Sequence, residues 1–545
     1  MDPAYPVCAQ KVEFLQVRWQ SDPCYAFYGV DGTTCSILTY LSQVEDFCPP
    51  RLGRNHTALP WHQKPPSYTE KAISNNSGLA MKFIRARVER MSERWTQAGV
   101  RMKQSHLLLQ TPVLQVLLYP GALAGSVGQR FEAMVERGGP LGELVQWADL
   151  SCSFLNLLCV FCDRSSLIGA APGRGSCPIQ RPITFDLIYT DYHGLAHLQG
   201  AMGLAFQHYQ CHFRILDSFG TEPVFNSANY ARSHGYKTLW GSWGLQPLQY
   251  MTMFPHTPDN SFLGFVSEEG LCSHGERNNL CSIFSLKKIL LETCKTSIKV
   301  PKKGYNMGPL RKYHVFPLSL QLFVGLGFPY EGPAPIEAIA LGCIFLQPRF
   351  DPPHSSENND FYKGKPTTRQ ISSQHPYAEE FIGKPYVWSV DVTNSTEIRE
   401  AIRAILSTES FTPQEFTCVG MLERVHGYIT HQNFCSKSAP TWPPESALKV
   451  HLGPLGQSCV SVCRRSSLLC EPALFHHLNT LSELTCTNVT LANLYALSFH
   501  PWGRHCGLQQ EPLLFSCAGS DPSYRRLCPC RVHLPGQVAL CPDCL

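Results

Sequence analysis

Two glutamates flank a glycine- and proline-rich turn, Glu331 and Glu337 in the segment LFVGLGFPYEGPAPIEAIALGC. Apolar residues 322–326 predict a buried strand end, and the Gly-Pro-Ala-Pro run at 332–335 predicts a turn that opens a helix. A strand, a tight turn and a helix start form the usual anion site of α/β proteins, because backbone N–H groups and the helix dipole attract phosphate. A glutamate in the first helical turn could then accept hydrogen bonds from a ribose diol. Alternatively, Glu337 only complements the helix dipole.

A third glutamate, Glu143, follows the Gly-Gly-Pro run at 138–140 and lies in the first turn of another predicted helix. A carboxylate at such a position can act as a general base if partial burial raises its pKa toward neutrality. The alternative is a charge that only complements the N-terminal end of the helix dipole.

Asp217 and Glu222 lie on either side of Gly220 in LDSFGTEP, and Trp240 and Trp243 follow. Carboxylates together with flat aromatic faces suit a sugar, because its C–H faces pack on rings while its hydroxyls need polar partners. The alternative is a polar loop over a tryptophan-rich core.

Lys365, in FYKGKPTTRQ, is a candidate contact for a phosphate, although a surface lysine would have the same pattern. No Asp-x-Asp pair, the usual holder of a divalent ion in sugar transfer, occurs in the chain. If the protein transfers a sugar, we therefore expect helix N-termini and basic side chains, with no metal, to stabilise the leaving phosphate.

The elements that must position these residues are those of an α/β protein. The segments FDLIYTDYHGL and FRILDSFGTEP each predict a buried strand followed by polar residues, and residues 78–110 predict a long helix. Polar groups at the carboxyl ends of parallel strands are where α/β sheets bind ligands.

Composition indicates an ordered, oxidised, secretory protein. The 545 residues allow two or three domains, and a net charge of +4 gives no electrostatic case for binding nucleic acid or an anionic membrane surface.

Ten of the 25 cysteines lie between Cys459 and Cys544. The short Cys-x(1–2)-Cys spacings there also suit zinc, but the irregular spacing of the ten favours disulfides. Glycosylation sequons agree, at Asn55, Asn75, Asn394 and Asn488. The N-terminus shows no signal peptide, and no apolar stretch reaches membrane-spanning length.

Several long phrases together carry a family resemblance, among them CYAFYGVDGT, GGPLGELVQWADL, FDLIYTDYHGL, LDSFGTEP, MTMFPHTPDNSFLGFVSEE, LFVGLGFPYEGPAPIEAIALGC and SQHPYAEEFIGKPYVW. With them the chain resembles the α-1,6-mannosylglycoprotein 6-β-N-acetylglucosaminyltransferases, most closely the B-type form. The resemblance implies a Golgi type II membrane enzyme of GT-B architecture, with two Rossmann-like domains. It implies inverting transfer of N-acetylglucosamine from UDP-N-acetylglucosamine to the 6-hydroxyl of an α-mannose, on N-glycans and O-mannosyl glycans, without metal or cofactor.

Carried over by motif, the resemblance makes Glu143 the catalytic base and places Asp217 and Trp240 on the acceptor side. Glu331, Glu337 and Lys365 would hold the uridine diphosphate. The family's disulfide plan implies eight pairs and leaves Cys35 without a partner: Cys8–Cys48, Cys24–Cys177, Cys211–Cys435, Cys459–Cys528, Cys463–Cys530, Cys470–Cys517, Cys486–Cys506 and Cys541–Cys544.

The resemblance also predicts a domain plan for the chain. Three segments contain no family phrases: 111–130, 151–170 and 270–321. We expect a membrane anchor upstream of this chain, and a donor domain that lacks its first strands and a Val-Tyr-Gly-Lys loop. The expected divisions are 1–50 (disulfide-tied module), 51–110 (linker and helix), 111–269 (acceptor-side Rossmann-like domain), 270–321 (non-matching insert), 322–435 (partial UDP-sugar-binding domain) and 436–545 (cysteine-rich domain).

Two other functions stay open on the sequence. An inactive secretory relative would bind mannosyl glycan through the acceptor half but would not bind nucleotide. A disulfide-rich interaction module would bind a protein partner through residues 436–545 alone.

Overall fold

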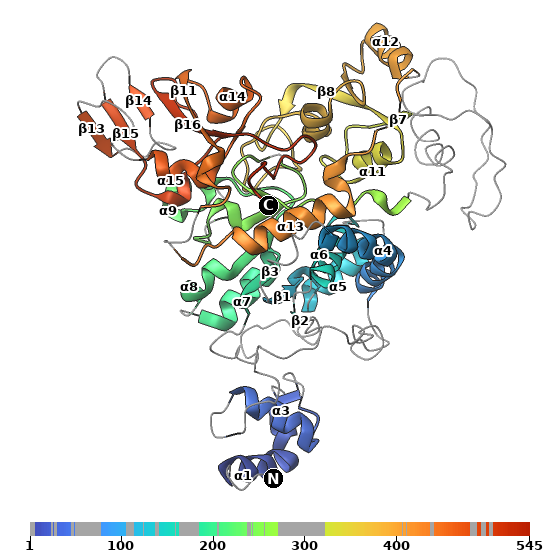
Figure 1. Ribbon diagram of the computed structural model, residues 1–545, viewed down its shortest axis with the longest axis vertical. Coiled ribbons are helices and arrows are strands. Elements are labelled where there is room, and N and C mark those ends of the chain that lie inside the picture. Colours follow the sequence, from blue (N-terminus) through green and yellow to red (C-terminus); the bar gives the residue numbers. More distant parts are fainter. Residues whose placement is uncertain are drawn as a thin grey trace, which may run out of the picture. The chain divides into compact units, whose positions relative to one another are not determined.

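A computed structural model gives the fold of the chain (Figure 1). It describes residues 6–545 apart from these gaps: 23–24, 27–29, 45–47, 49–77, 105–113, 124, 137–140, 158–159, 163–184, 204–205, 237–240, 242, 256, 271–321, 406, 410, 437–440, 480–487, 492–497 and 501–504. Trp240, the sequons at Asn55 and Asn75, and the cysteines Cys24, Cys177 and Cys486 lie outside the described residues.

The chain forms two compact units. The first contains Met1–Glu89, Pro112–Asp217 and Asn433–Ser438, and the second contains Arg90–Thr111, Ser218–Gln432 and Ala439–Leu545. This division separates residues 112–217 from 218–269, although the sequence assigns both segments to one domain, 111–269. The six-part domain plan stays a prediction.

The N-terminal part of the first unit is a pair of helices, α1 (Pro6–Arg18) and α3 (Thr34–Val44), which pack on each other. Their apolar side chains, including Val12, Leu15 and Ile37, form a small core of their own. The Cys8–Cys48 disulfide joins the two ends of this segment. So small a core buries little apolar surface, and a covalent link is the usual compensation.

The rest of the first unit is built on parallel strands in the order β2 (Val160–Cys162), β1 (Gln115–Tyr119), β3 (Leu187–Thr190) and β4 (Phe213–Leu216). Strands β3 and β4 are buried along their length, as the sequence predicts, and α7 (Tyr192–Met202) packs against both of them. Helix α6 (Leu141–Asn156) begins where the Gly-Gly-Pro run predicts a helix.

In the second unit, β10 (Val387–Val390), β8 (Ile344–His354) and β7 (Leu322–Val324) form a parallel sheet, and β9 (Ile371–Ser373) adds to β8 in the antiparallel sense. Helices α11 (Ala334–Ala340) and α12 (Ser395–Ile405) pack on this sheet. The predicted strand–turn–helix–strand unit is therefore confirmed. Strand β7 differs from the prediction in being half-buried and in ending at Val324.

The C-terminal part of the second unit is a mixed sheet in the order β11 (Leu448–Leu455), β16 (Arg525–Arg531), β14 (Ser498–His500), β15 (His505–Leu508) and β13 (Asn488–Leu491), with β12 (Leu469–Cys470) on β16. Disulfides Cys459–Cys528 and Cys463–Cys530 join α14 (Cys459–Arg464) to β16. The cysteines themselves make up much of the buried core here.

The expected disulfides whose two cysteines are both described are all present: Cys8–Cys48, Cys211–Cys435, Cys459–Cys528, Cys463–Cys530, Cys470–Cys517 and Cys541–Cys544. The other two expected pairs, Cys24–Cys177 and Cys486–Cys506, include cysteines outside the described residues. Cys506 is also disulfide-bonded, as is Cys343, for which the sequence predicts no pairing. Cys35 is an exposed free thiol. In the part of the chain that the structure describes, none of the helices combines the length and apolarity needed to cross a bilayer.

Candidate active site

Glu143 lies in the first turn of α6, in the first unit, and its side chain is half-buried. The following turns of the helix are buried almost without interruption, from Leu144 to Leu150. Asp149, on the same helix, is fully buried and accepts two hydrogen bonds from Arg87, at 3.0 and 2.9 Å. Helix α6 therefore carries one carboxylate in a buried ion pair and one that is partly open to solvent at its N-terminal end.

Asp217 follows β4 directly, at the carboxyl end of a buried strand, as predicted. It is buried, and the Tyr192 hydroxyl donates a hydrogen bond to its Oδ2 atom at 2.8 Å. Asp191, which the sequence does not single out, follows the neighbouring strand β3 and caps α7. Its carboxylate accepts from the N–H groups of Gly194 and Ala122, and burial raises its pKa above the ordinary value.

Glu331, in the second unit, has φ +51, a left-handed backbone conformation that is uncommon outside glycine. Its carboxylate forms a bidentate ion pair with Arg369, at 2.7 and 3.0 Å, and accepts a hydrogen bond from the Tyr362 hydroxyl at 3.2 Å. Only 7% of the Glu331 side chain and 12% of the Arg369 side chain are exposed. The turn is therefore fixed by a buried charge pair.

The pKa values around this pair reflect burial first and charge second. Burial and the Glu331 carboxylate both raise the pKa of Tyr362 far above its ordinary value, so the phenol stays a donor. Burial alone would lower the pKa of Arg369, but Glu331 overcomes this effect and raises it. The guanidinium is thus charged at neutral pH.

The other two predicted donor-side residues lie in the same unit. Glu337 is in the first turn of α11, as predicted, and is half-buried. The ammonium of Lys365 lies 4.1 Å from the centroid of the Phe219 ring. An aromatic ring attracts a cation through its quadrupole but carries no formal charge, so this contact leaves a positive charge in place.

Glu222, for which the sequence leaves a sugar contact and a polar loop open, is hydrogen-bonded to a loop that is distant in the sequence. Its Oε1 atom accepts from the Thr367 hydroxyl at 2.6 Å and the Thr368 N–H at 2.8 Å, and its Oε2 atom accepts from the Thr368 hydroxyl at 2.6 Å. All three bonds hold the loop that contains Lys365. Phe219 contributes to the same region, because its carbonyl oxygen accepts from Arg369 at 3.1 Å.

His375 supports the turn at Glu331 through contacts of both ring nitrogens. Its Nε2 atom is 3.2 Å from the Gly332 carbonyl oxygen, and its Nδ1 atom accepts from the Ala378 N–H at 3.2 Å. The two contacts require a neutral ring with the proton on Nε2. Burial lowers the pKa of His375 to about 4, although the nearby Glu331 carboxylate acts in the opposite direction.

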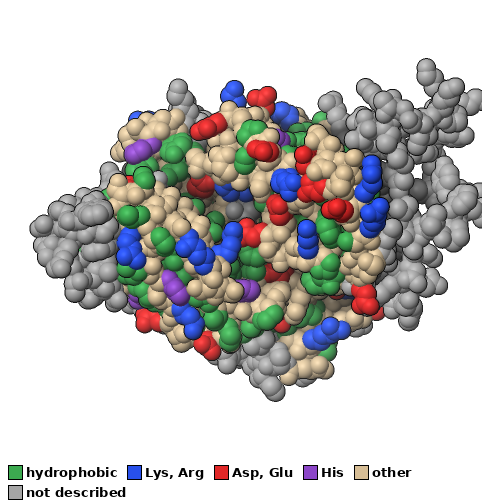
Figure 2. Space-filling model, turned by 90° about the horizontal axis from the view of Figure 1, so that it is seen from above, with side chains coloured by type: hydrophobic (Ala, Val, Ile, Leu, Met, Phe, Trp, Pro, Cys, Tyr) green, Lys and Arg blue, Asp and Glu red, His purple; other side chains and the backbone are tan. Residues whose placement is uncertain are grey.

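A cavity of about 730 Å³ in the second unit is bounded partly by Glu222 and Arg369, and by aromatic side chains such as Tyr377 and Trp442. Its charged lining residues belong to ion pairs or hydrogen-bonded groups, including Arg531 with Glu471. The face seen in Figure 2 likewise carries acidic and basic side chains interspersed, without a large patch of one sign among the described residues. This distribution agrees with the near-zero net charge.

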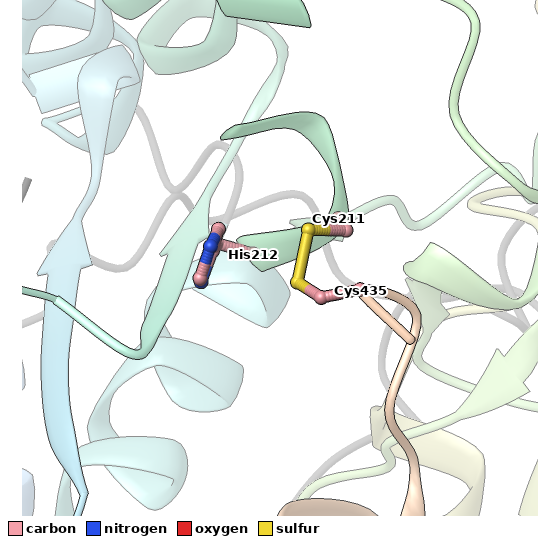
Figure 3. A group of neighbouring side chains, drawn as sticks. All are labelled: Cys211, His212 and Cys435. Carbon is pink, nitrogen blue, oxygen red and sulfur yellow. A yellow bond between two sulfur atoms is a disulfide. The ribbon is translucent and has the colours of Figure 1, made fainter. Parts of the chain in front are cut away.

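One group of described residues has the composition of a metal site: Cys211, His212 and Cys435 (Figure 3). The two cysteine sulfurs are bonded to each other at 2.08 Å, and His212 Nδ1 lies 2.8 Å from the Asp186 carbonyl oxygen. A disulfide has no thiolate to offer a metal, so this group is a structural crosslink.

The predicted site residues therefore fall into two sets. Glu143 and Asp217 belong to the first unit, and Glu331, Glu337 and Lys365 belong to the second. Sequence reasoning missed Arg369, Tyr362 and the loop contacts of Glu222. No local signal could have revealed them, because the partners are separated by 31 to 146 residues in the chain.

Comparison with known proteins identifies the family to which the chain belongs. The model of glycosyltransferase family 18 matches residues 24–280 and 286–530. Apart from residues 281–285, the match includes the three segments in which we found no family phrases, 111–130, 151–170 and 270–321. The human α-1,6-mannosylglycoprotein 6-β-N-acetylglucosaminyltransferase B is 43% identical over 632 aligned positions, covering 100% of this chain and 80% of the relative. The human A-type enzyme is 44% identical, covering 99% of this chain and 80% of its own length, and the Caenorhabditis elegans enzyme is 32% identical, covering 99% and 88%.

The alignment with the B-type enzyme is longer than the 545 residues of this chain, so that relative carries internal residues that this chain lacks. The similarity nevertheless extends over both units and includes every candidate site residue. The chain belongs to glycosyltransferase family 18.

Proposed function

We propose that the protein transfers N-acetylglucosamine from UDP-N-acetylglucosamine to the 6-hydroxyl of an α-linked mannose, on N-glycans and O-mannosyl glycans, and forms a β-1,6 linkage. The observation that carries this proposal is the identity of 43% along the whole chain to a relative whose name specifies the 6-β-N-acetylglucosaminyl transfer. The proposal includes a GT-B arrangement of two Rossmann-like domains and a position in the Golgi lumen.

In this mechanism Glu143 removes the proton from the mannose 6-hydroxyl as its oxygen forms a bond to the anomeric carbon. The bond from that carbon to the diphosphate breaks with its electron pair on the leaving oxygen, and the configuration inverts. A half-buried carboxylate at a helix start can accept this proton, and such assistance contributes about 10²- to 10⁴-fold. Asp217 and Trp240 line the acceptor side.

The leaving diphosphate gains charge as the bond breaks, and Lys365 is the residue that we assign to stabilise it. Glu337 accepts from the ribose, and Glu331 contributes through the turn that its ion pair with Arg369 fixes. No metal is assigned, because the sequence lacks an Asp-x-Asp pair.

The experiment is a transfer assay on the chain secreted with an added signal peptide. UDP-N-acetylglucosamine and an agalacto-biantennary acceptor are supplied with and without EDTA, and the linkage of the product is determined. Equal formation of β-1,6-linked product in both conditions supports the proposal, and product that requires a divalent metal overturns the metal-free part of it.

A second function has one observation in its favour. The relative carries internal residues that this chain lacks, and a protein without part of its donor half would bind glycan without transferring sugar. Binding of mannosyl glycan without binding of UDP, in calorimetric titrations of the same protein, would establish this alternative.

A further inference from the structure

The loop Gly364–Thr368 is held to the segment 218–222 by one carboxylate. Glu222 accepts from the Thr367 hydroxyl, the Thr368 hydroxyl and the Thr368 N–H, all within 2.8 Å. The Glu222 N–H in turn donates to the Pro366 carbonyl oxygen at 2.9 Å. Four hydrogen bonds therefore join Glu222 to the residues that directly follow Lys365.

The same contacts continue to Glu331 through a chain of hydrogen bonds. The Thr367 hydroxyl donates to Glu222 and accepts from the Arg369 Nε atom at 3.1 Å. Arg369 then donates to both carboxylate oxygens of Glu331. Arg369 is the donor in both directions along this chain, and a Thr367 hydroxyl that accepts from the guanidinium becomes a stronger donor to Glu222.

Burial makes this arrangement costly to break. Thr367 is 2% exposed, and the Arg369 and Glu331 side chains are 12% and 7% exposed. Water therefore cannot readily replace a lost partner, and an unpaired group there would carry its desolvation cost. The position of Lys365 over the Phe219 ring depends on the loop that these bonds fix.

We propose that Glu222 is a positioning residue for the donor side: it holds the Gly364–Thr368 loop so that the Lys365 ammonium lies where the diphosphate binds. This inference rests on the proposed function, which assigns Lys365 to the diphosphate. Glu222 acts through Thr367 and Thr368 and does not itself contact the nucleotide. Its loss weakens donor binding without affecting the acceptor.

The test is calorimetric titration of UDP into the full chain and four variants. Glu222→Ala removes the three side-chain bonds, and we expect UDP affinity to fall about tenfold, a loss typical of one charged hydrogen bond. Glu222→Gln keeps an oxygen for Thr367 and the Thr368 N–H, so its affinity stays near that of the native protein. Thr368→Val removes a single bond from an exposed side chain and lowers affinity about threefold, which keeps the test valid if Glu222→Ala does not fold.

Glu397→Ala is the matched control, because Glu397 also accepts from one backbone N–H and from side-chain donors, those of Arg349, in the same unit. We expect Glu397→Ala to bind UDP like the native protein. In the transfer assay, we expect the donor KM of Glu222→Ala to rise while its acceptor KM stays constant. Folded Glu222→Ala and Thr368→Val with native UDP affinity would overturn the inference, as would an equal loss in Glu397→Ala. A native protein that does not bind UDP would instead remove the proposed function, and this inference with it.

Discussion

Two candidate carboxylates, Glu331 in the second unit and Glu143 in the first, lie in opposite settings. In the second unit, Glu331 and Glu222 are each held by several donors, and both fix turns or loops. In the first unit, Glu143 is half-buried at the start of α6, while Asp149 on the same helix has the structural role. The comparison teaches that a carboxylate in a buried ion pair maintains the fold, whereas one at an accessible helix start can exchange a proton.

The sharpest test of this distinction lies within α6. Asp149→Ala leaves the Arg87 guanidinium buried without its carboxylate, and we expect the free energy of unfolding to fall by about 3–5 kcal/mol. Glu143→Gln is expected to change it by about 0.5 kcal/mol or less, since it replaces a half-exposed group with one of equal size. Denaturant unfolding of both variants measures the two changes in unfolding free energy. Similar losses in the two variants would contradict the distinction between a structural Asp149 and an accessible Glu143.

A smaller effect comes from the neutral histidine that supports the Glu331 turn. The pKa of His375 is about 4 in the folded protein and 6.5 in the unfolded chain. Its contribution to stability is therefore complete above pH 6.5 and is lost as the pH falls toward 4, by about 3 kcal/mol in total. His375→Gln, whose amide can donate and accept at the same places, should lack this dependence.

The measurement is the difference in unfolding free energy between the native protein and His375→Gln across this pH range. A difference is needed because burial raises the pKa of Asp259 to about 6. Asp259 therefore lowers stability as the pH rises from about 4 to 6, which opposes the effect of His375. Parallel pH curves for the two proteins would contradict a buried neutral ring at position 375.

The smallest expected effect concerns the positive charge of Lys365. Lys365→Ala should raise the donor KM about tenfold, or about 1.4 kcal/mol, with little change in stability. Lys384→Ala is the matched control, because Lys384 also lies over an aromatic ring, 4.3 Å from the centroid of Trp388. Equal effects of the two substitutions on donor KM would mean that Lys365 has no special relation to the diphosphate.

Local patterns in the sequence predict the elements that carry the candidate site. Strands β3 and β4, the start of α6 and the unit from β7 to β8 follow from apolar runs and from glycine and proline at their ends. The cysteine content likewise predicts a disulfide-tied C-terminal part. These features depend on residues close together in the chain.

The polar network of the second unit could not be predicted in the same way. Glu331 and Arg369 are 38 residues apart, and Glu222 and Thr367 are 145 apart, so their pairing depends on the tertiary fold. The local context of Glu222 leaves both a sugar contact and a polar loop open, because nothing in LDSFGTEP indicates that two distant threonines donate to its carboxylate. Tertiary packing determines which distant polar residues meet, and the periodicity of apolar residues along the chain does not reveal it.

The central claim is that Glu143 is the base in a sugar transfer whose donor side is organised separately in the second unit. The measurement that tests it most directly is the transfer rate of Glu143→Gln under saturating substrates, with UDP affinity and melting temperature measured on the same preparation. We expect the rate to fall about 10²- to 10⁴-fold while UDP affinity and melting temperature stay native. Native transfer by a folded Glu143→Gln protein would contradict the account, because another group would then have to accept the proton.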